Sequence, residues 1–244
     1  MNKKLKCIVS IANIMLEATH KSERVSQLLY NDRVEVLGPE SGNWIPIKSA
    51  YNGTLGWVLK GQFIEIDEIE FNLKPFSVYL PSQVEQSNWN QIPGTLFYSQ
   101  DHTQSTQLQL VGNNIQDIEA ILQMYMNSPY MWGGITPQGI DCSGLSKMLY
   151  RYLGIPLACY AAEQFNQGKI LDFIQNAVCG DLAFFENDDH EISHVGILVN
   201  SSEIIHATEK AGYVVRDFID QEGIISKKTG ERTHKLRLIK RILN

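Results

Sequence analysis

A glycine-rich loop leads directly into a helical pattern between Tyr130 and Leu153, and this stretch constrains the fold more than any other part of the chain. Apolar side chains follow the loop at three- and four-residue intervals, and Gly154 and Pro156 end the pattern. The spacing predicts a helix over residues 142–153 with one packed face. Cys142 then lies in the first helical turn, where backbone N–H groups and the helix dipole favour a thiolate.

Two interpretations of Cys142 follow from this position. A thiol at a helix start is a candidate nucleophile if a base lies beside it. Most free cysteines, however, are small buried hydrophobic residues, and the helix alone does not separate the two. The decision therefore depends on which polar side chains the rest of the fold brings to Cys142.

The hydrophobic period changes along the second half of the chain. Helical stripes are predicted over residues 114–125, with Asn113 or Asn114 as the cap, then over 142–153 and 161–166. Strand patterns follow at residues 180–185, 194–199, 203–207, 213–215 and 235–239. Helices followed by strands predict an α+β fold in which a helix packs on an antiparallel sheet.

Short strands also dominate the first third of the chain. Alternating or β-branched segments occur at residues 7–11, 27–30, 33–37, 44–48 and 56–59, separated by turn signals. This spacing predicts a small β-barrel. Residues 34–37, 44–48 and 56–58 resemble the bacterial SH3 family in their order. We therefore expect an SH3-like barrel over residues 1–70, a linker over 71–112 and a second domain over 113–244.

Composition and charge narrow the classes of function. The chain has 244 residues, 43% of them hydrophobic, and a net charge of −6, which argues against nucleic acid or an anionic membrane as a partner. Its four cysteines are widely spaced, with no Cys-x-x-Cys or His-x-x-x-His motif. We expect no metal site, no cofactor and no membrane span, and no feature of the sequence determines the oligomeric state.

The amino-terminal residues bear on location. Lysines near the start resemble a signal peptide, but the apolar run that follows reaches only Leu16, is interrupted by Asn13 and has no clear cleavage site. We therefore expect a cytoplasmic protein. A periplasmic or secreted protein is the alternative.

Two histidines stand inside the predicted strands 194–199 and 203–207. If a three-residue loop joins these strands, Val199 pairs with Glu203 and Gly196 pairs with His206. His194 and His206 are then diagonal neighbours on one face, about 7–8 Å apart between backbones. A two-residue loop would put them on opposite faces. On one face, His206 can orient His194 while His194 faces Cys142.

A cysteine at a helix start followed by a histidine on a strand is the arrangement of papain-like enzymes. The motifs Tyr-Met-Trp-Gly-Gly (130–134), Asp-Cys-Ser-Gly-Leu (141–145), Gly-Asp-Leu-Ala-Phe-Phe (180–185), Ser-His-Val-Gly-Ile (193–197) and Ile-His-Ala (205–207) occur in order. Together they resemble the NlpC-type cell-wall cysteine peptidases over about residues 114–242.

The resemblance implies a role for six residues. It implies Cys142 as nucleophile, His194 as base and His206 as the orienting third member. Asp141 and Ser143 would bind the amino terminus of a substrate, although Asp141 is also a natural helix cap. Tyr130 would lie near the active site, where a packed aromatic residue is the alternative. The chain departs from the family's pattern at residues 157–162, which support the pocket in relatives.

The resemblance also implies a substrate. Proteins with a bacterial SH3 domain before an NlpC-type domain are similar to γ-D-glutamyl-L-diamino acid endopeptidases, which cut murein stem peptides before diaminopimelate or lysine. Several require a free amino-terminal L-alanine, and the SH3 domain narrows their site. Two alternatives stay open: a papain-like amidase or acyltransferase that acts on another acyl substrate, and a non-catalytic protein that binds cell-wall peptides.

Overall fold

The computed structural model describes residues 2–75, 77–79, 92–98, 108–110 and 116–243. The chain divides into two compact units, Met1–Gly112 and Asn113–Asn244, which are called unit 1 and unit 2 and are described separately. Among the helices that these residues form, none combines the length and apolarity needed to cross a bilayer.

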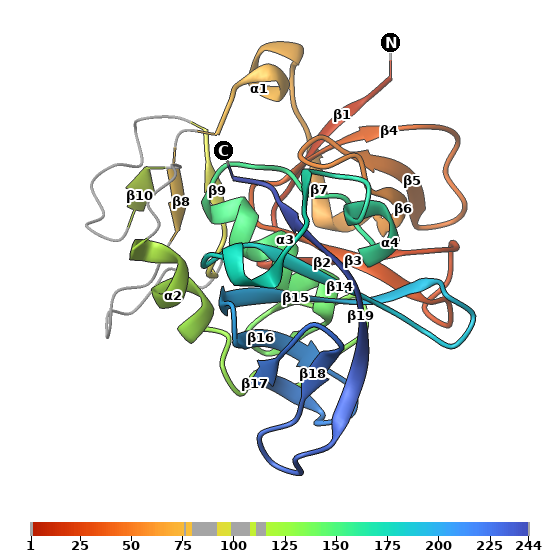
Figure 1. Cartoon of the computed structure of the whole chain (residues 1–244). Coiled ribbons are helices and arrows are strands. Elements are labelled where there is room, and N and C mark those ends of the chain that lie inside the picture. The colour runs from red at the N-terminus through yellow and green to blue at the C-terminus, as the bar shows by residue number, and fades with distance from the viewer. Residues whose placement is uncertain (1, 76, 80–91, 99–107, 111–115, 244) are drawn as a thin grey trace. The chain divides into compact units, whose positions relative to one another are not determined.

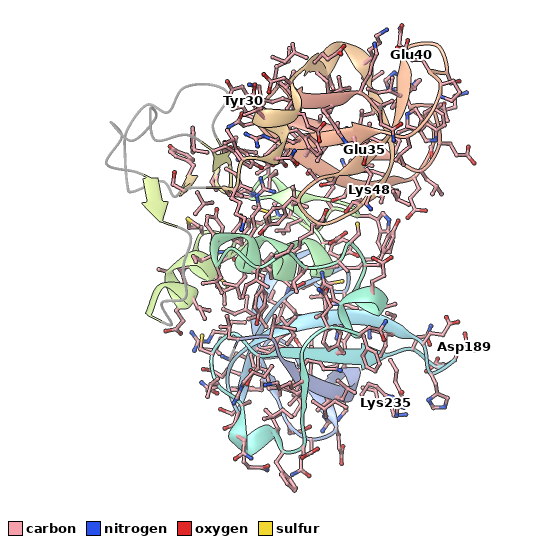
Figure 2. All side chains as sticks on the ribbon, turned by 90° about the horizontal axis from the view of Figure 1, so that it is seen from above. Tyr30, Glu35, Glu40, Lys48, Asp189 and Lys235 are labelled. Atoms are coloured by element: carbon pink, nitrogen blue, oxygen red, sulfur yellow. The ribbon has the colours of Figure 1, made fainter. Side chains whose placement is uncertain are left out.

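Unit 1 is built from short antiparallel strands that pair in the order β3-β2-β6-β5-β4-β1-β7 (Figure 1). The strands are β1 (Lys4–Cys7), β2 (Ile11–Met15), β3 (Arg24–Leu29), β4 (Arg33–Val36), β5 (Trp44–Ser49), β6 (Leu55–Leu59) and β7 (Phe63–Glu65). Polar pairs occupy the solvent-facing register positions; for example, Glu35 on β4 lies opposite Lys48 on β5 (Figure 2). The SH3-like strands predicted at residues 27–30, 33–37, 44–48 and 56–59 are confirmed. The segment predicted as a strand at residues 7–11 instead spans the connection between β1 and β2, and β7 was not predicted.

The predicted linker over 71–112 contains regular structure. Helix α1 (Glu68–Asn72) precedes a small antiparallel sheet of β8 (Ser77–Tyr79), β9 (Leu96–Phe97) and β10 (Leu108–Leu110). Residues 80–91 and 99–107 of this segment lie outside the described residues. The same is true of the predicted helix cap at Asn113 or Asn114.

Unit 2 places its helices before most of its sheet, as the change of period predicted. The helices are α2 (Gln116–Gln123), α3 (Cys142–Tyr152) and α4 (Ala161–Gln164), with a two-stranded hairpin of β11 (Ile135–Thr136) and β12 (Gly139–Ile140) before α3. The sheet strands are β13 (Lys169–Leu171), β14 (Leu182–Glu186), β15 (Ile192–Asn200), β16 (Glu203–Thr208), β17 (Tyr213–Ile219), β18 (Gly223–Ile225) and β19 (Arg232–Arg241). The α+β fold class with an antiparallel sheet is confirmed.

The sheet of unit 2 closes into a barrel, which the sequence did not predict. Strands pair in the order β13-β19-β14-β15-β16-β17-β18, and β18 pairs again with β19. Strand β19 is long enough to pair with β18 near its start and with β14 further on (Figure 1). An extra residue, Arg237, forms a bulge in β19 opposite Phe184 and Phe185 of β14. Strand β14 thus lies between β15 and β19, which brings residues near the start of β19 close to residues of β15.

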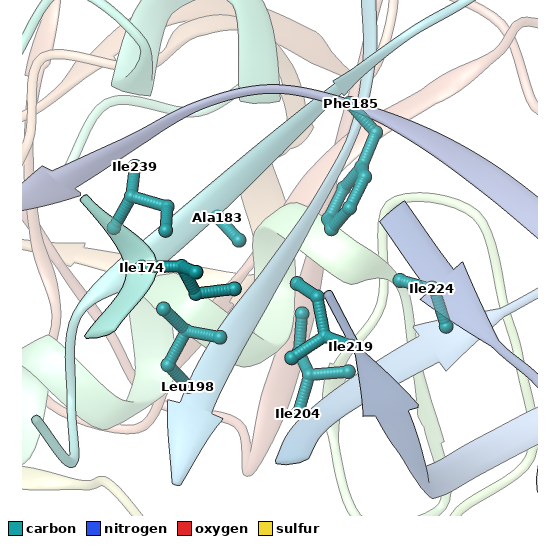
Figure 3. Close-up of a cluster of buried hydrophobic side chains, with 8 residues drawn as sticks. All are labelled: Ile174, Ala183, Phe185, Leu198, Ile204, Ile219, Ile224 and Ile239. Atoms are coloured by element: carbon teal, nitrogen blue, oxygen red, sulfur yellow. The ribbon is translucent and has the colours of Figure 1, made fainter. Parts of the chain in front are cut away.

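An aliphatic cluster fills this barrel between its strands. Each of the strands β14 to β19 contributes at least one side chain, and Ile174 of a short 3₁₀ turn completes the cluster (Figure 3). The members are Ile174, Ala183, Phe185, Leu198, Ile204, Ile219, Ile224 and Ile239. On the other side of β14, Phe184 meets Phe165 edge-on at 5.6 Å. Strand β14 is buried on both faces, which explains its continuous apolar sequence.

Candidate active site

Cys142 begins helix α3 beneath the glycine-rich loop. The loop packs so closely on the first helical turn that a Cβ on Gly144 would lie 2.1 Å from the carbonyl oxygen of Gly134. The N–H of Met131 donates to the carbonyl of Ile140 at 3.0 Å and holds the loop across the β11–β12 hairpin. The glycines thus let the loop fix Cys142 at the helix start.

Asp141 caps this helix with both carboxylate oxygens. Oδ1 accepts from the Gly144 N–H at 2.5 Å and from the Ser143 hydroxyl at 3.1 Å, while Oδ2 accepts from the Gly133 N–H at 2.7 Å. Asp141 and Ser143 are buried, and neither lines the cavity of unit 2 that contains Cys142. The capping interpretation of Asp141 is confirmed, and substrate binding by Asp141 and Ser143 stays a prediction.

The environment of the Cys142 sulfur favours the neutral thiol in the free protein. Burial, together with the Asp141 charge, raises the pKa of Cys142 to about 12. Backbone N–H groups of Val195, Ser143 and Cys142 itself act in the opposite direction but lower the pKa by less. The expected thiolate is therefore not the resting form, because loss of hydration outweighs the helix start.

The hairpin that carries the two histidines has the predicted register near them, but its turn differs from the prediction. Ile197 pairs with Ile205 and Leu198 with Ile204, as expected, but Asn200 rather than Val199 pairs with Glu203. A bulge between Leu198 and Asn200 therefore compensates for the tight turn that joins the strands. This bulge keeps His194 and His206 on one face despite the short connection.

The two histidines and an aspartate form a continuous hydrogen-bonded chain. His194 Nε2 lies 2.9 Å from His206 Nδ1, and His206 Nε2 lies 3.2 Å from Asp217 Oδ2. His194 and His206 are both buried, and burial lowers the pKa of each. The sequence prediction missed Asp217 because its strand pattern stopped at residue 215, whereas β17 continues to Ile219 with Asp217 two positions beyond the partner of His206.

A third histidine, His234 on β19, was also missed. Its ring stacks on that of His194 with centroids 4.2 Å apart and planes inclined by 20°. Burial lowers the pKa of His234 to about 3, so the ring is neutral near pH 7. This residue reaches the site because β14 pairs with β15 on one side and with β19 on the other, and no local pattern in the sequence indicates these pairings.

Among the described residues, His194, His206 and His234 form a group that could hold a metal ion. Their candidate ligand atoms lie within 4.8 Å of one another. However, His194 Nε2 and His206 Nδ1 are already hydrogen-bonded to each other. The near-parallel rings of His194 and His234 also direct their nitrogen lone pairs side by side instead of toward one point. The arrangement suits a proton chain better than a metal centre.

A cavity of about 580 Å³ opens beside Cys142 and His194. Tyr130, Trp132 and His234 also line it. Burial and the neighbouring Cys142 and Asp141 raise the pKa of Tyr130, so its hydroxyl keeps its proton. The volume lies within the usual range for ligand pockets, which is about 300–1,000 Å³.

Charged residues of both signs surround this cavity. Lys210, Arg232 and Lys235 line it together with the acids Glu186 and Glu209. Lys235 pairs with Glu186 at the end of β14 and forms an ion pair with it at 2.5 Å. A pocket with both signs of charge suits a zwitterionic ligand such as a peptide.

The segment 157–162, where the resemblance departs from the family, packs away from this cavity. Gln164 is fully buried and joins the segment to α3, since its amide donates to the carbonyls of Ala158 and Ser143, both at 3.0 Å. Ser146 on α3 donates to the side-chain oxygen of Gln164 at 2.6 Å. The segment therefore braces the helix that carries Cys142.

Comparison with known proteins assigns both units. Residues 127–233 match the sequence profile of the NlpC/P60 family, and residues 13–65 match that of the bacterial SH3 domain. The chain is similar to the gamma-D-glutamyl-L-lysine dipeptidyl-peptidase of Bacillus subtilis, at 25% identity over 215 residues, which is 75% of this chain and 71% of that protein. It is 23% identical over 261 residues to dipeptidyl-peptidase 6 of Lysinibacillus sphaericus, covering 88% of this chain and 91% of that protein.

The fold has a counterpart among solved structures. An NlpC/P60 family protein from Bacillus cereus superposes with a TM-score of 0.71 at 18% identity, covering 99% of this chain and 100% of that one. At this level of identity the similarity concerns the fold alone.

Proposed function

Because the chain contains an NlpC/P60 domain preceded by a bacterial SH3 domain, we propose that it is a cysteine endopeptidase that cuts murein stem peptides. The bond would be the one between γ-D-glutamate and the following diamino acid, diaminopimelate or lysine. The relatives named gamma-D-glutamyl-L-lysine dipeptidyl-peptidase and dipeptidyl-peptidase 6 support this substrate class.

One observation carries the proposal: a thiol at a helix start shares a cavity with the first histidine of a hydrogen-bonded chain. His194 uses Nε2 to reach His206, which leaves Nδ1 as the ring nitrogen available to the Cys142 proton. A cysteine that served only packing would need no such partner. A protein that only binds peptides would not need a second histidine and an aspartate behind the first.

The reaction proceeds by acyl transfer in two steps. As the Cys142 sulfur bonds to the γ-glutamyl carbonyl carbon, its proton passes to His194. The backbone N–H of Cys142 stabilises the oxyanion. Collapse of the intermediate breaks the C–N bond, and His194 returns the proton to the leaving amine. Water then attacks the thioester with His194 as base, which releases the acid and restores the thiol.

The resting thiol and imidazole are both neutral, so the chemistry requires their proton transfer to be coupled to substrate binding. Asp217 carries a negative charge and is hydrogen-bonded to His206, which in turn is hydrogen-bonded to His194. This chain stabilises the imidazolium that forms on His194. The cost of ionising a buried thiol is thereby offset at the moment of attack instead of in the free enzyme.

We further propose that the enzyme prefers peptides with a free amino-terminal L-alanine. The relatives named as dipeptidyl-peptidases support this preference. A carboxylate pairs with an ammonium group and rejects an acylated one, which is the role that the resemblance implies for Asp141 beside its function as the helix cap. Such a preference suits degradation of released peptides in the cytoplasm, which is the location that we propose.

The experiment compares L-Ala-γ-D-Glu-diaminopimelate with its N-acetylated form, using mass spectrometry to measure kcat/KM for each. We expect release of L-Ala-D-Glu from the free peptide and a loss of at least about 100-fold on acetylation. Equal cleavage of both peptides would refute the free-amine preference and argue against the cytoplasmic location. Failure to cleave either one would refute the peptidase assignment.

A further inference from the structure

Asp217 ends the histidine chain and belongs to none of the motifs that identify the domain. It lies on β17 with its side chain 10% exposed, and its Oδ2 is 3.2 Å from His206 Nε2. The other oxygen, Oδ1, accepts from the backbone N–H of Lys227 at 2.8 Å. Each oxygen of the carboxylate therefore has a defined partner.

The direction of the hydrogen bonds follows from these partners. An ionised carboxylate only accepts, so His206 must carry its proton on Nε2 and donate it to Asp217. The Nδ1 of His206 is then a lone pair, which accepts from a proton on His194 Nε2. Since a neutral imidazole has one N–H, the Nδ1 of His194 is left as the acceptor.

We propose that Asp217 is a positioning residue that sets the tautomers of both histidines, so that His194 presents a basic nitrogen to the thiol. The inference rests on the proposed function, in which Cys142 is the nucleophile and His194 the base. Asp217 acts at a distance of two rings from the sulfur and contacts no substrate.

The charge state of Asp217 is consistent with this role. Burial raises the pKa of its carboxyl, but hydrogen bonds from His206 and from the Lys227 backbone outweigh burial and lower that pKa below its usual range. The group is therefore an acceptor at neutral pH. Lys227 is itself held by an ion pair to Glu203 at 2.5 Å, which anchors the backbone N–H that faces Asp217.

Asparagine at position 217 gives an informative substitution because the Lys227 N–H can only donate. The amide oxygen of Asp217→Asn must face Lys227, so the amide NH₂ faces His206 Nε2 and requires a lone pair there. The proton of His206 then moves to Nδ1 and points at His194 Nε2. His194 becomes protonated on Nδ1 and can no longer accept the proton of Cys142.

Alanine at the same position does not determine the direction of the hydrogen bond at His206 Nε2. A second cavity of about 270 Å³ is lined by His206 and Asp217 and has room for water. In Asp217→Ala, water can accept from or donate to His206 Nε2, so the productive tautomer stays available. The shape-conserving variant should therefore be worse than the truncated one, whereas a purely structural role predicts the reverse order.

The test measures kcat, KM and histidine tautomers in Asp217→Asn and Asp217→Ala, with the murein tripeptide as substrate. For Asp217→Asn we expect kcat to fall by about 100-fold or more with KM little changed, and a smaller loss for Asp217→Ala. NMR of isotope-labelled histidine should show His206 protonated on Nε2 in the wild type and on Nδ1 in Asp217→Asn. Asp172→Asn, the same change at an exposed position that does not line the cavity of Cys142, should match the wild type.

The outcomes separate this inference from the proposed function. If the wild type does not cleave the peptide, the peptidase proposal fails, and the NMR comparison still decides the tautomers. If the wild type is active and Asp217→Asn keeps the wild-type tautomer or exceeds Asp217→Ala in kcat, the role of Asp217 is refuted.

Discussion

His234 lies against the ring of His194 as a neutral imidazole and changes how the protein responds to acid. Its folded pKa of about 3 is far below the value near 6.5 expected for the unfolded chain. The unfolded state therefore binds a proton below about pH 6.5 that the folded state refuses. The corresponding stability is fully present above that pH and is lost progressively as the pH falls toward 3.

Replacement of His234 by phenylalanine tests this linkage, because phenylalanine keeps an aromatic ring against His194 and removes the titrating nitrogen. Between pH 7 and pH 4, we expect the free energy of unfolding to fall by roughly 2 kcal/mol less in His234→Phe than in the wild type. Urea denaturation at both pH values measures the difference. Parallel pH dependence in the two proteins would show that His234 titrates normally when folded.

Strand β18 closes the barrel of unit 2, and one glycine makes the closure feasible. Gly223 has φ +141°, and a Cβ there would lie 1.8 Å from the carbonyl oxygen of His234 on β19. The backbone of β19 cannot retreat without displacing His234 from His194. The close pairing of β18 with β19 therefore helps to fix His234 against His194 in the candidate active site.

Gly223→Ala is expected to lower the free energy of unfolding by about 3 kcal/mol, because it combines backbone strain with a clash against main-chain atoms. Gly212→Ala provides the matched control: Gly212 has φ +85° but no atom within 4 Å of the added Cβ. Its cost should be limited to strain, about 1 kcal/mol. Equal losses in the two variants, measured by urea denaturation, would mean that the contact with β19 is unimportant.

The helix and hairpin that bear Cys142, His194 and His206 could be predicted because their signals are local. The stop at Gly154 and the periodicity predict α3, and the strand patterns predict the hairpin of His194 and His206. Their shared face was one of two alternatives, because it depends on the length of the loop between the strands. The bulge near Val199 could not be predicted, because the extra residue lies in an apolar run, residues 195–199, in which no alternation is present to be interrupted.

The roles of Asp217 and His234 could not be predicted from the sequence, for a different reason. Asp217 approaches His206 through the pairing of β16 with β17, and His234 approaches His194 because β15 and β19 pair with the two edges of β14. Both contacts depend on which strands meet, and a single sequence does not specify that. The sequence also predicted a thiolate at Cys142, whereas burial favours the neutral thiol. The helix start is visible in the local sequence, but the burial of the sulfur depends on the whole fold.

At the scale of the whole molecule, the chemistry lies within unit 2. Cys142, the histidine chain and the cavity beside them all come from residues 130–235. Unit 1 supplies a bacterial SH3 domain, which we propose restricts the peptides that reach the site. The residues proposed for bond cleavage thus belong to unit 2 alone, and restriction of the substrate by unit 1 is a separate proposal.

The central claim is that Cys142 cleaves a γ-glutamyl peptide bond with His194 as its base. The most direct measurement incubates L-Ala-γ-D-Glu-diaminopimelate with the wild type and with Cys142→Ala, and follows both products by mass spectrometry. We predict that L-Ala-D-Glu and diaminopimelate appear in equal amounts with the wild type and not with Cys142→Ala, while both proteins have similar thermal stability. Cleavage by Cys142→Ala at the wild-type rate would contradict the account, and so would binding of the peptide by the wild type without cleavage.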